Sequence, residues 1–148
     1  KFRKADVIYV GGGDTVFMIE HWKKTGTLSM IEEAYQRGVL LAGLSAGAIC
    51  WFSDIYTDSL KTEDGAQYAM FQGLNWIKGI ISPHYGQRML DFDKIVCYNY
   101  SCAYGIEDNG ALYIEDDEIV GSISSGGKAY RIVNTDGILE KREIEKAF

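Results

Sequence analysis

The sequence has little of the residue types on which fibrous, disordered and disulfide-stabilised proteins depend. Only one of its 148 residues is proline, and only three are cysteine. The single proline excludes a collagen-like repeat, and 24% charged residues are too few for a disordered chain. Because 47% of the residues are hydrophobic, the chain can bury a core. We therefore expect one globular domain over residues 1–148.

Positive charge is also scarce, since 15 lysines and arginines stand against 21 aspartates and glutamates. The net charge of −6, with no basic run, argues against nucleic acid as a partner. No hydrophobic run approaches the roughly 20 residues that a membrane span needs, and no leader sequence is visible. We predict an acidic, soluble protein that has neither a nucleic acid nor a membrane as its partner.

Residues that bind metals or form disulfides are few and scattered. Cys50, Cys97 and Cys102 form no C-x-x-C pair, and the two histidines, His21 and His84, are far apart in the sequence. We therefore expect no disulfide framework, no metal site and no cofactor. Unpaired cysteines fit the reducing cytoplasm, where we expect the protein to reside.

The chain does contain short hydrophobic runs, glycine turns and amphipathic segments in alternation. We predict strands at 6–10, 39–43, 76–81 and 102–106, and helices at 15–25, 29–38, 46–52 and 90–100. Residues 53–75 are polar and are predicted to be an irregular surface segment, and the C-terminal third is predicted to form antiparallel strands. This order predicts an α/β fold, with a mostly parallel sheet flanked by helices and a short antiparallel C-terminal part.

The pentapeptide Gly43-Leu-Ser45-Ala-Gly47 joins a predicted strand to a predicted helix. This G-x-S-x-G pattern is typical of a nucleophile elbow, in which glycines permit a sharp turn that exposes the serine hydroxyl. The N–H of Ala46 would then face a developing oxyanion. A corner of small residues with only a packing role is the alternative, and the pentapeptide alone leaves the choice open.

A catalytic serine needs a base, and His84 is the better placed of the two histidines. It follows a predicted strand, at the sheet edge where the sites of parallel sheets gather, whereas His21 lies inside a predicted helix. A carboxylate must then orient the imidazole. Glu107 and Asp108 both follow the strand at 102–106, and either could serve.

A glycine loop in the sequence Val10-Gly-Gly-Gly-Asp-Thr15 lies between the first predicted strand and helix. It lacks the Lys-Ser/Thr of a phosphate-binding loop and the third glycine of a dinucleotide-binding motif. Backbone N–H groups at a helix N-terminus also suit a carbonyl oxyanion. Gly12 and Gly13 are therefore candidates for the second donor beside Ala46.

The motifs GGGDT, GLSAGA, SPHYGQR and GIEDNGAL, in this order, resemble the peptidase E family of serine peptidases (family S51, with cyanophycinase as a relative). The resemblance implies a class I glutamine amidotransferase-like fold, with Ser45 as nucleophile and His84 as base. It also implies an oxyanion hole from Gly12, Gly13 and Ala46. The alignment of GIED with the family pattern favours Asp108 as the acidic member, with Glu107 as the alternative.

Peptidase E enzymes cleave dipeptides after an N-terminal aspartate, so the resemblance implies a serine peptidase that acts on small peptides. Arg88 and Asp14 are the substrate-binding candidates that it suggests. Alternatives are a non-catalytic ligand-binding or sensor domain on the same fold, a cyanophycinase-like β-aspartyl peptidase and a general esterase. Family members usually have a further strand–helix–strand at the N-terminus, which we expect this chain to lack.

Overall fold

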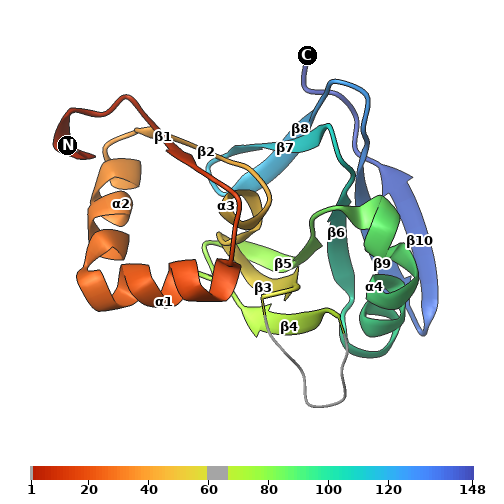
Figure 1. Ribbon diagram of the computed structural model, residues 1–148. Helices are drawn as coiled ribbons and strands as arrows, with labels where there is room; N and C mark the ends of the chain where they lie inside the picture. Colours follow the sequence, from red (N-terminus) through yellow and green to blue (C-terminus); the bar gives the residue numbers. More distant parts are fainter. Residues whose placement is uncertain (1, 60–66) are drawn as a thin grey trace.

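A computed structural model describes residues 2–59 and 67–148 (Figure 1). In chain order, the elements are η1 (Phe2–Lys4), β1 (Val7–Val10), α1 (Thr15–Thr25), α2 (Thr27–Gln36), β2 (Leu40–Gly43), α3 (Ala46–Ile49), β3 (Phe52–Thr57), β4 (Ala69–Gln72), β5 (Ile77–Ser82), α4 (Tyr85–Asn99), β6 (Cys102–Ile106), β7 (Gly110–Glu115), β8 (Glu118–Ser124), β9 (Ala129–Thr135) and β10 (Ile138–Glu143).

The strands form three sheets within the described part of the chain. β1 and β2 pair in parallel, β7 and β8 form an antiparallel hairpin, and six strands form a sheet in the order β10-β9-β6-β5-β3-β4. β3, β5 and β6 run parallel, whereas β4, β9 and β10 join them antiparallel. The predicted α/β class, with antiparallel strands at the C-terminal end, is confirmed.

Helices cover these sheets and connect them. α4 packs against β5, β6 and β10, and α1 packs against α2 beside the β1–β2 pair (Figure 1). The short α3 contacts β1, β2 and β3, so it joins the two-stranded sheet to the six-stranded one. The loop that precedes α3 therefore lies where the two sheets meet.

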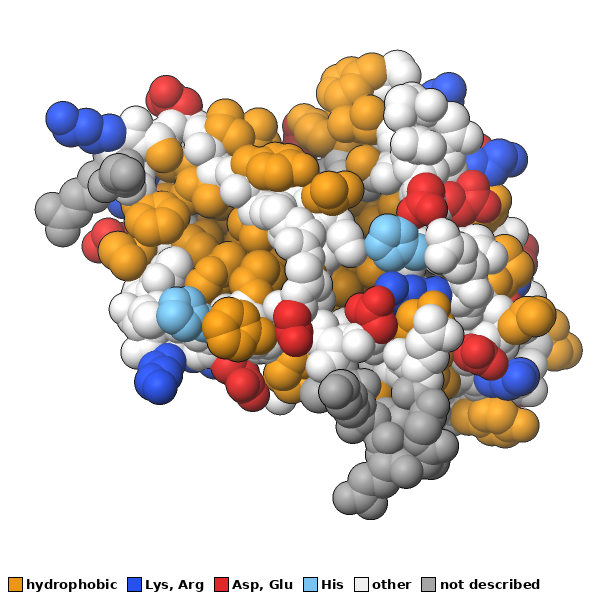
Figure 2. All heavy atoms as spheres, viewed as in Figure 1, with side chains coloured by type: hydrophobic (Ala, Val, Ile, Leu, Met, Phe, Trp, Pro, Cys, Tyr) orange, Lys and Arg blue, Asp and Glu red, His pale blue; other side chains and the backbone are white. Residues whose placement is uncertain are grey.

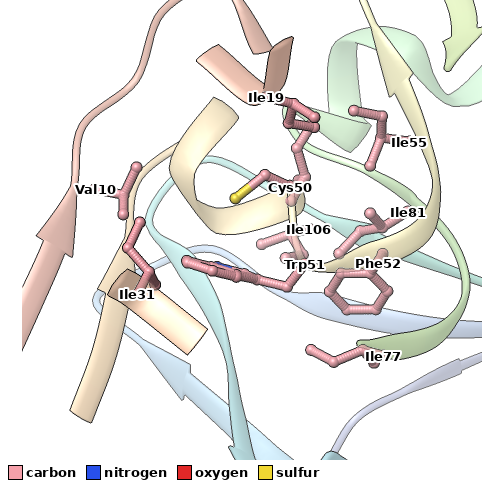
Figure 3. Packing of buried hydrophobic residues seen from close by; sticks show 11 residues of the cluster. Val10, Ile19, Ile31, Cys50, Trp51, Phe52, Ile55, Ile77, Ile81 and Ile106 are labelled. Atoms are coloured by element: carbon pink, nitrogen blue, oxygen red, sulfur yellow. The ribbon is translucent and has the colours of Figure 1, made fainter. Parts of the chain in front are cut away.

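Two hydrophobic clusters hold this arrangement together. One combines side chains from α1, α2, α3, β3, β5 and β6, among them Ile19, Ile31, Trp51, Phe52 and Ile81 (Figure 3). The other lies under α4 and includes Tyr56, Tyr85, Phe92, Val96 and Ile132. Burying side chains of this size contributes roughly 1.5–3 kcal/mol each, so the two clusters hold α3 and α4 against the sheets.

Four predicted segments differ from the structure. The segment 53–75 was predicted to be irregular, yet it contains most of β3 and all of β4; its residues 60–66 lie outside the described residues. The acidic residues of this segment led to the prediction of a loop, although Phe52, Ile55 and Tyr56 of β3 are buried. The helix predicted at 46–52 ends at Ile49, because β3 begins immediately afterwards.

The helix predicted at 90–100 begins five residues earlier, at Tyr85. The hydrophobic residues of this segment have a mixed spacing, so the first turn, which directly follows His84, was not predicted. As a result, His84 is the residue that precedes the helix, and side chains of the first turn project near it. α2 likewise begins at Thr27, two residues before the predicted start, with Gly26 at φ 75° as its N-cap.

Hydrophobic side chains gather on the part of the surface formed by α1, α2, β1 and β2 (Figure 2). Val7, Tyr9, Phe17 and Leu40 are each more than half exposed. The two-stranded sheet thus leaves apolar surface that the described residues do not cover.

Candidate active site

Ser45 lies in the sharp turn between β2 and α3. Its backbone has φ 50° and ψ −111°, a conformation that non-glycine residues rarely adopt. A Cβ at Gly43 would lie 2.0 Å from the carbonyl oxygen of Gly47, and a Cβ at Gly47 would lie 2.2 Å from that of Val10. The two glycines are therefore required by close backbone approach, and the turn is strained where strain often marks function.

His84 lies beside this serine at the end of β5. Its Nε2 is 3.1 Å from Ser45 Oγ, within hydrogen-bond distance. Its backbone is left-handed, with φ 52° and ψ 38°, so a second residue of the site has an uncommon conformation. The serine and the histidine thus come from the ends of two strands that belong to different sheets.

Asp108 contacts the other side of the imidazole. His84 Nδ1 is 2.5 Å from Asp108 Oδ1. Because an ionised carboxylate only accepts hydrogen bonds, it selects the tautomer in which Nδ1 carries the proton and Nε2 is free to accept the proton of Ser45. Gln87 Nε2 donates to Asp108 Oδ2 at 3.1 Å and holds the carboxylate from its second oxygen.

Glu107, the alternative acidic residue, faces other partners. Its carboxylate accepts hydrogen bonds from the Lys128 N–H at 3.0 Å and from the Tyr130 hydroxyl at 3.2 Å. Burial, together with this carboxylate, raises the pKa of Tyr130 above its ordinary value, so the hydroxyl remains a donor at neutral pH. Glu107 therefore ties the end of β6 to β9, whereas Asp108 contacts the histidine.

The glycine loop lies against the nucleophile. A Cβ at Gly12 would be 3.4 Å from Ser45 Cβ, and the Leu44 N–H donates to the Val10 carbonyl at 3.0 Å. Within residues 2–59 and 67–148, the backbone N–H groups of Gly12, Gly13 and Ala46 have no hydrogen-bond partner. These three predicted donors therefore have no competing acceptor in that part of the chain.

The two predicted substrate-binding residues have partners within the protein. Asp14 is the N-cap of α1 and accepts a hydrogen bond from the Phe17 N–H at 2.9 Å. The Arg88 side chain is only 6% exposed; it donates to the Tyr56 carbonyl at 3.1 Å and contacts Asp58 Oδ2 at 3.3 Å. Neither residue lines the cavity next to Ser45.

That cavity has a volume of about 440 Å³ and opens beside the Ser45–His84–Asp108 group. Most of its lining is hydrophobic and comes from β2, α3, β6 and β7, including Leu41, Leu44, Trp51, Leu112 and Ile114. An apolar cavity with a few polar groups at one end is typical of a site for a small ligand.

The other histidine, candidate metal ligands and the helices were also compared with the expectations from sequence. His21 lies in α1 and stacks on Phe17, with ring centroids 5.6 Å apart. Searched over residues 2–59 and 67–148, the side chains of histidine, cysteine, aspartate and glutamate form no group that could hold a metal ion. None of the helices in that part of the chain is long and apolar enough to cross a membrane.

The sequence matches the sequence model of peptidase family S51 over residues 1–121. The chain belongs to peptidase family S51. Its curated relatives include the uncharacterized peptidase YgaJ of Bacillus subtilis, which is 36% identical over 134 residues, or 86% of this chain. Uncharacterized peptidase Lin0382 of Listeria innocua is 31% identical over 84% of this chain.

Solved structures support the fold. A peptidase from an acI-B1 actinobacterium superposes with a TM-score of 0.64, at 20% identity over 99% of this chain and 59% of its own. A putative peptidase E from Listeria monocytogenes gives a TM-score of 0.54, at 22% identity over 97% of this chain and 62% of its own. The chain spans 56% of the length of YgaJ and 62% of that of Lin0382.

Sequence reasoning did not assign a role to Gln87, although it lies in the SPHYGQR motif. Gln87 lies in the first turn of α4, three residues after the N-cap His84, and both side chains contact Asp108. The signal that could have found it was this spacing, once the helix boundary was known.

Proposed function

We propose that this chain is the catalytic part of a serine peptidase that hydrolyses small peptides. The observation that carries the proposal is the hydrogen-bonded series Ser45 Oγ, His84 Nε2, His84 Nδ1 and Asp108 Oδ1, with its serine on a strained strand-to-helix turn. A nucleophile, a base and a carboxylate in this order are the parts that acyl transfer requires. Membership of a peptidase family supports the same conclusion.

In the proposed reaction, Ser45 Oγ attacks the carbonyl carbon of the scissile peptide bond, and His84 Nε2 takes the hydroxyl proton. The carbonyl oxygen becomes an oxyanion, which the N–H groups of Ala46 and of Gly12 or Gly13 stabilise. His84 then gives the proton to the leaving amine as the C–N bond breaks. His84 then takes a proton from water as the water oxygen attacks the acyl carbon; the C–Oγ bond breaks, the acid leaves, and His84 returns the proton to Ser45 Oγ.

The substrate class is a small peptide, and an N-terminal aspartate is the preferred residue in this proposal. Arg88 is the cation that would bind its side chain. The guanidinium already contacts a carboxylate, that of Asp58, whose side chain is 59% exposed. A substrate carboxylate would replace it on Nη2 while the Tyr56 carbonyl continues to hold Nη1.

A panel of dipeptides tests the proposal. Asp-X, isoaspartyl-X and neutral dipeptides of equal length are incubated with the wild-type protein and with Ser45→Ala, and the released amino acids are quantified. We expect hydrolysis of Asp-X above neutral dipeptides, and none with Ser45→Ala at an unchanged melting temperature. Preference for isoaspartyl peptides would indicate a cyanophycinase-like substrate, and hydrolysis that persists in Ser45→Ala would refute the serine mechanism.

A further inference from the structure

A cluster of hydroxyl groups lies beside the glycine loop, and the reaction as described does not use it. The Thr15 N–H donates to Ser59 Oγ at 2.8 Å, and Thr57 Oγ1 donates to the same oxygen at 2.9 Å. The Ser59 N–H donates back to Thr57 Oγ1 at 3.2 Å. Thr15 is 2% exposed and Thr57 is 1% exposed, so these hydrogen bonds are largely shielded from water.

The cluster links two distant parts of the chain. Thr15 is the first residue of α1 and follows the glycine loop directly, whereas Thr57 and Ser59 lie at the end of β3. The first N–H groups of a helix have no partner within the helix. Asp14 binds the Phe17 N–H, and Ser59 binds that of Thr15 from 44 positions away.

Packing leaves room around much of the glycine loop. A Cβ at Gly11 or Gly13 would meet nothing within 4 Å, whereas one at Gly12 would lie 3.4 Å from Ser45 Cβ. The loop is held at its start by the hydrogen bond from the Leu44 N–H to the Val10 carbonyl. At its other end, Asp14 caps α1 from within the loop, and Ser59 Oγ is the partner that Thr15 finds outside it.

The end of β3 is itself well fixed. Arg88 of α4 donates to the carbonyl of Tyr56, three residues before Ser59, and this hydrogen bond is kept when a substrate carboxylate replaces Asp58 on the guanidinium. The guanidinium also lies over the ring of Tyr68, 4.5 Å from its centroid. Ser59 therefore projects its hydroxyl from a segment that is tied to the same helix that follows His84.

We propose that Ser59, supported by Thr57, is a positioning residue that holds the glycine loop at the distance from Ser45 at which its N–H groups bind the oxyanion. This inference rests on the proposed function. Ser59 acts through Thr15 and the loop and does not contact the reacting atoms. Because an oxyanion forms only in the transition state, loss of the Ser59 hydroxyl lowers kcat and leaves KM nearly unchanged.

The test compares Ser59→Ala with Ser59→Thr, which keeps a hydroxyl, and with Ser53→Ala as a matched control. Ser53 is also on β3. Its hydroxyl donates to Asn75 Oδ1 at 2.6 Å, so this hydrogen bond does not involve the glycine loop. Loss of one oxyanion donor costs about 100-fold to 1,000-fold in kcat, and a misplaced donor costs less. We expect Ser59→Ala to lower kcat about 10-fold to 100-fold.

The same variants are treated with a fluorophosphonate, whose P=O oxygen uses the oxyanion site, and the inactivation rate is measured. That rate is expected to fall in Ser59→Ala in parallel with kcat, to return to within about threefold of wild type in Ser59→Thr, and to be unchanged in Ser53→Ala. Ser59→Ala leaves the Thr15 N–H without its partner in a buried position, so its melting temperature should fall by more than that of Ser53→Ala, while both variants remain folded at the assay temperature.

The outcomes separate this inference from the proposed function. If hydrolysis and phosphonylation depend on Ser45 but Ser59→Ala behaves like Ser53→Ala, the positioning role is wrong and the peptidase proposal stands. If Ser59→Ala raises KM alone or merely lowers the melting temperature, the role is again wrong. If the folded wild-type protein is not phosphonylated at Ser45, both proposals are overturned.

Discussion

The most informative substitution is Asp108→Asn, because it leaves the shape of the site unchanged and removes one charge. The carboxylate contacts His84 Nδ1 at 2.5 Å and is held by Gln87 at 3.1 Å. An asparagine can present its amide –NH₂ to Nδ1, which favours the tautomer whose Nε2 carries the proton. That nitrogen can no longer accept the proton of Ser45.

The size of the effect follows from the geometry. When His84 becomes an imidazolium in the transition state, the Asp108 charge lies roughly 4 Å from it. The attraction is about 4 kcal/mol at an effective dielectric constant near 20 and about half that near 40. Because the Asp108 side chain is 53% exposed, we take the range of about 2–4 kcal/mol. This corresponds to a fall in kcat of ~30-fold to ~1,000-fold, to which the tautomer effect adds.

Glu107→Gln is the matched control, since it makes the same chemical change one residue away. It weakens the hydrogen bonds from Lys128 and Tyr130, at a cost of about 1 kcal/mol, or roughly 2–4 °C in melting temperature. Steady-state kinetics on the best dipeptide should show kcat within about threefold of wild type. The reasoning is refuted if Asp108→Asn is fully active, or if Glu107→Gln loses as much activity.

Two further predictions concern the elbow and the specificity. Gly47→Ala should lower the melting temperature steeply, because the added Cβ would lie 2.2 Å from the Val10 carbonyl oxygen. Gly86→Ala, whose Cβ would meet nothing within 4 Å, should be neutral or slightly stabilising. Equal melting temperatures of the two variants would contradict the elbow geometry. Asp58→Asn should lower KM for Asp-X but not for neutral dipeptides, because it frees one donor of Arg88. An unchanged KM for Asp-X, or the same change in KM for both substrates, would exclude Arg88 as the aspartate-binding residue.

Local patterns were enough to predict part of this arrangement. The strands at 7–10, 40–43, 77–82 and 102–106 are close to their predicted positions, because each is a short apolar run bounded by turn residues. The G-x-S-x-G pattern and the histidine after a strand are likewise local, and they identified Ser45 and His84 as candidates without any three-dimensional information.

What the sequence could not give depends on side-chain direction and on distant contacts. Glu107 and Asp108 are adjacent, so the sequence pattern does not distinguish which of them contacts the histidine. In the structure Glu107 accepts a hydrogen bond from Tyr130, whereas Asp108 contacts His84. Strand β3 was missed because Asp54 within it and Asp58 directly after it are typical of a loop, although pairing with both β4 and β5 stabilises the strand. The bond from Thr15 to Ser59 spans 44 positions, and no local pattern predicts it.

Labelling with a fluorophosphonate, followed by mass spectrometry of the digested protein, tests the central claim most directly, because the reagent reacts with an activated serine and requires no knowledge of the substrate. The account predicts one adduct per chain, located on Ser45, absent in Ser45→Ala and formed far more slowly in His84→Ala. A folded wild-type protein that remains unlabelled, or that is labelled equally in Ser45→Ala, would contradict it and would favour a ligand-binding domain on this fold.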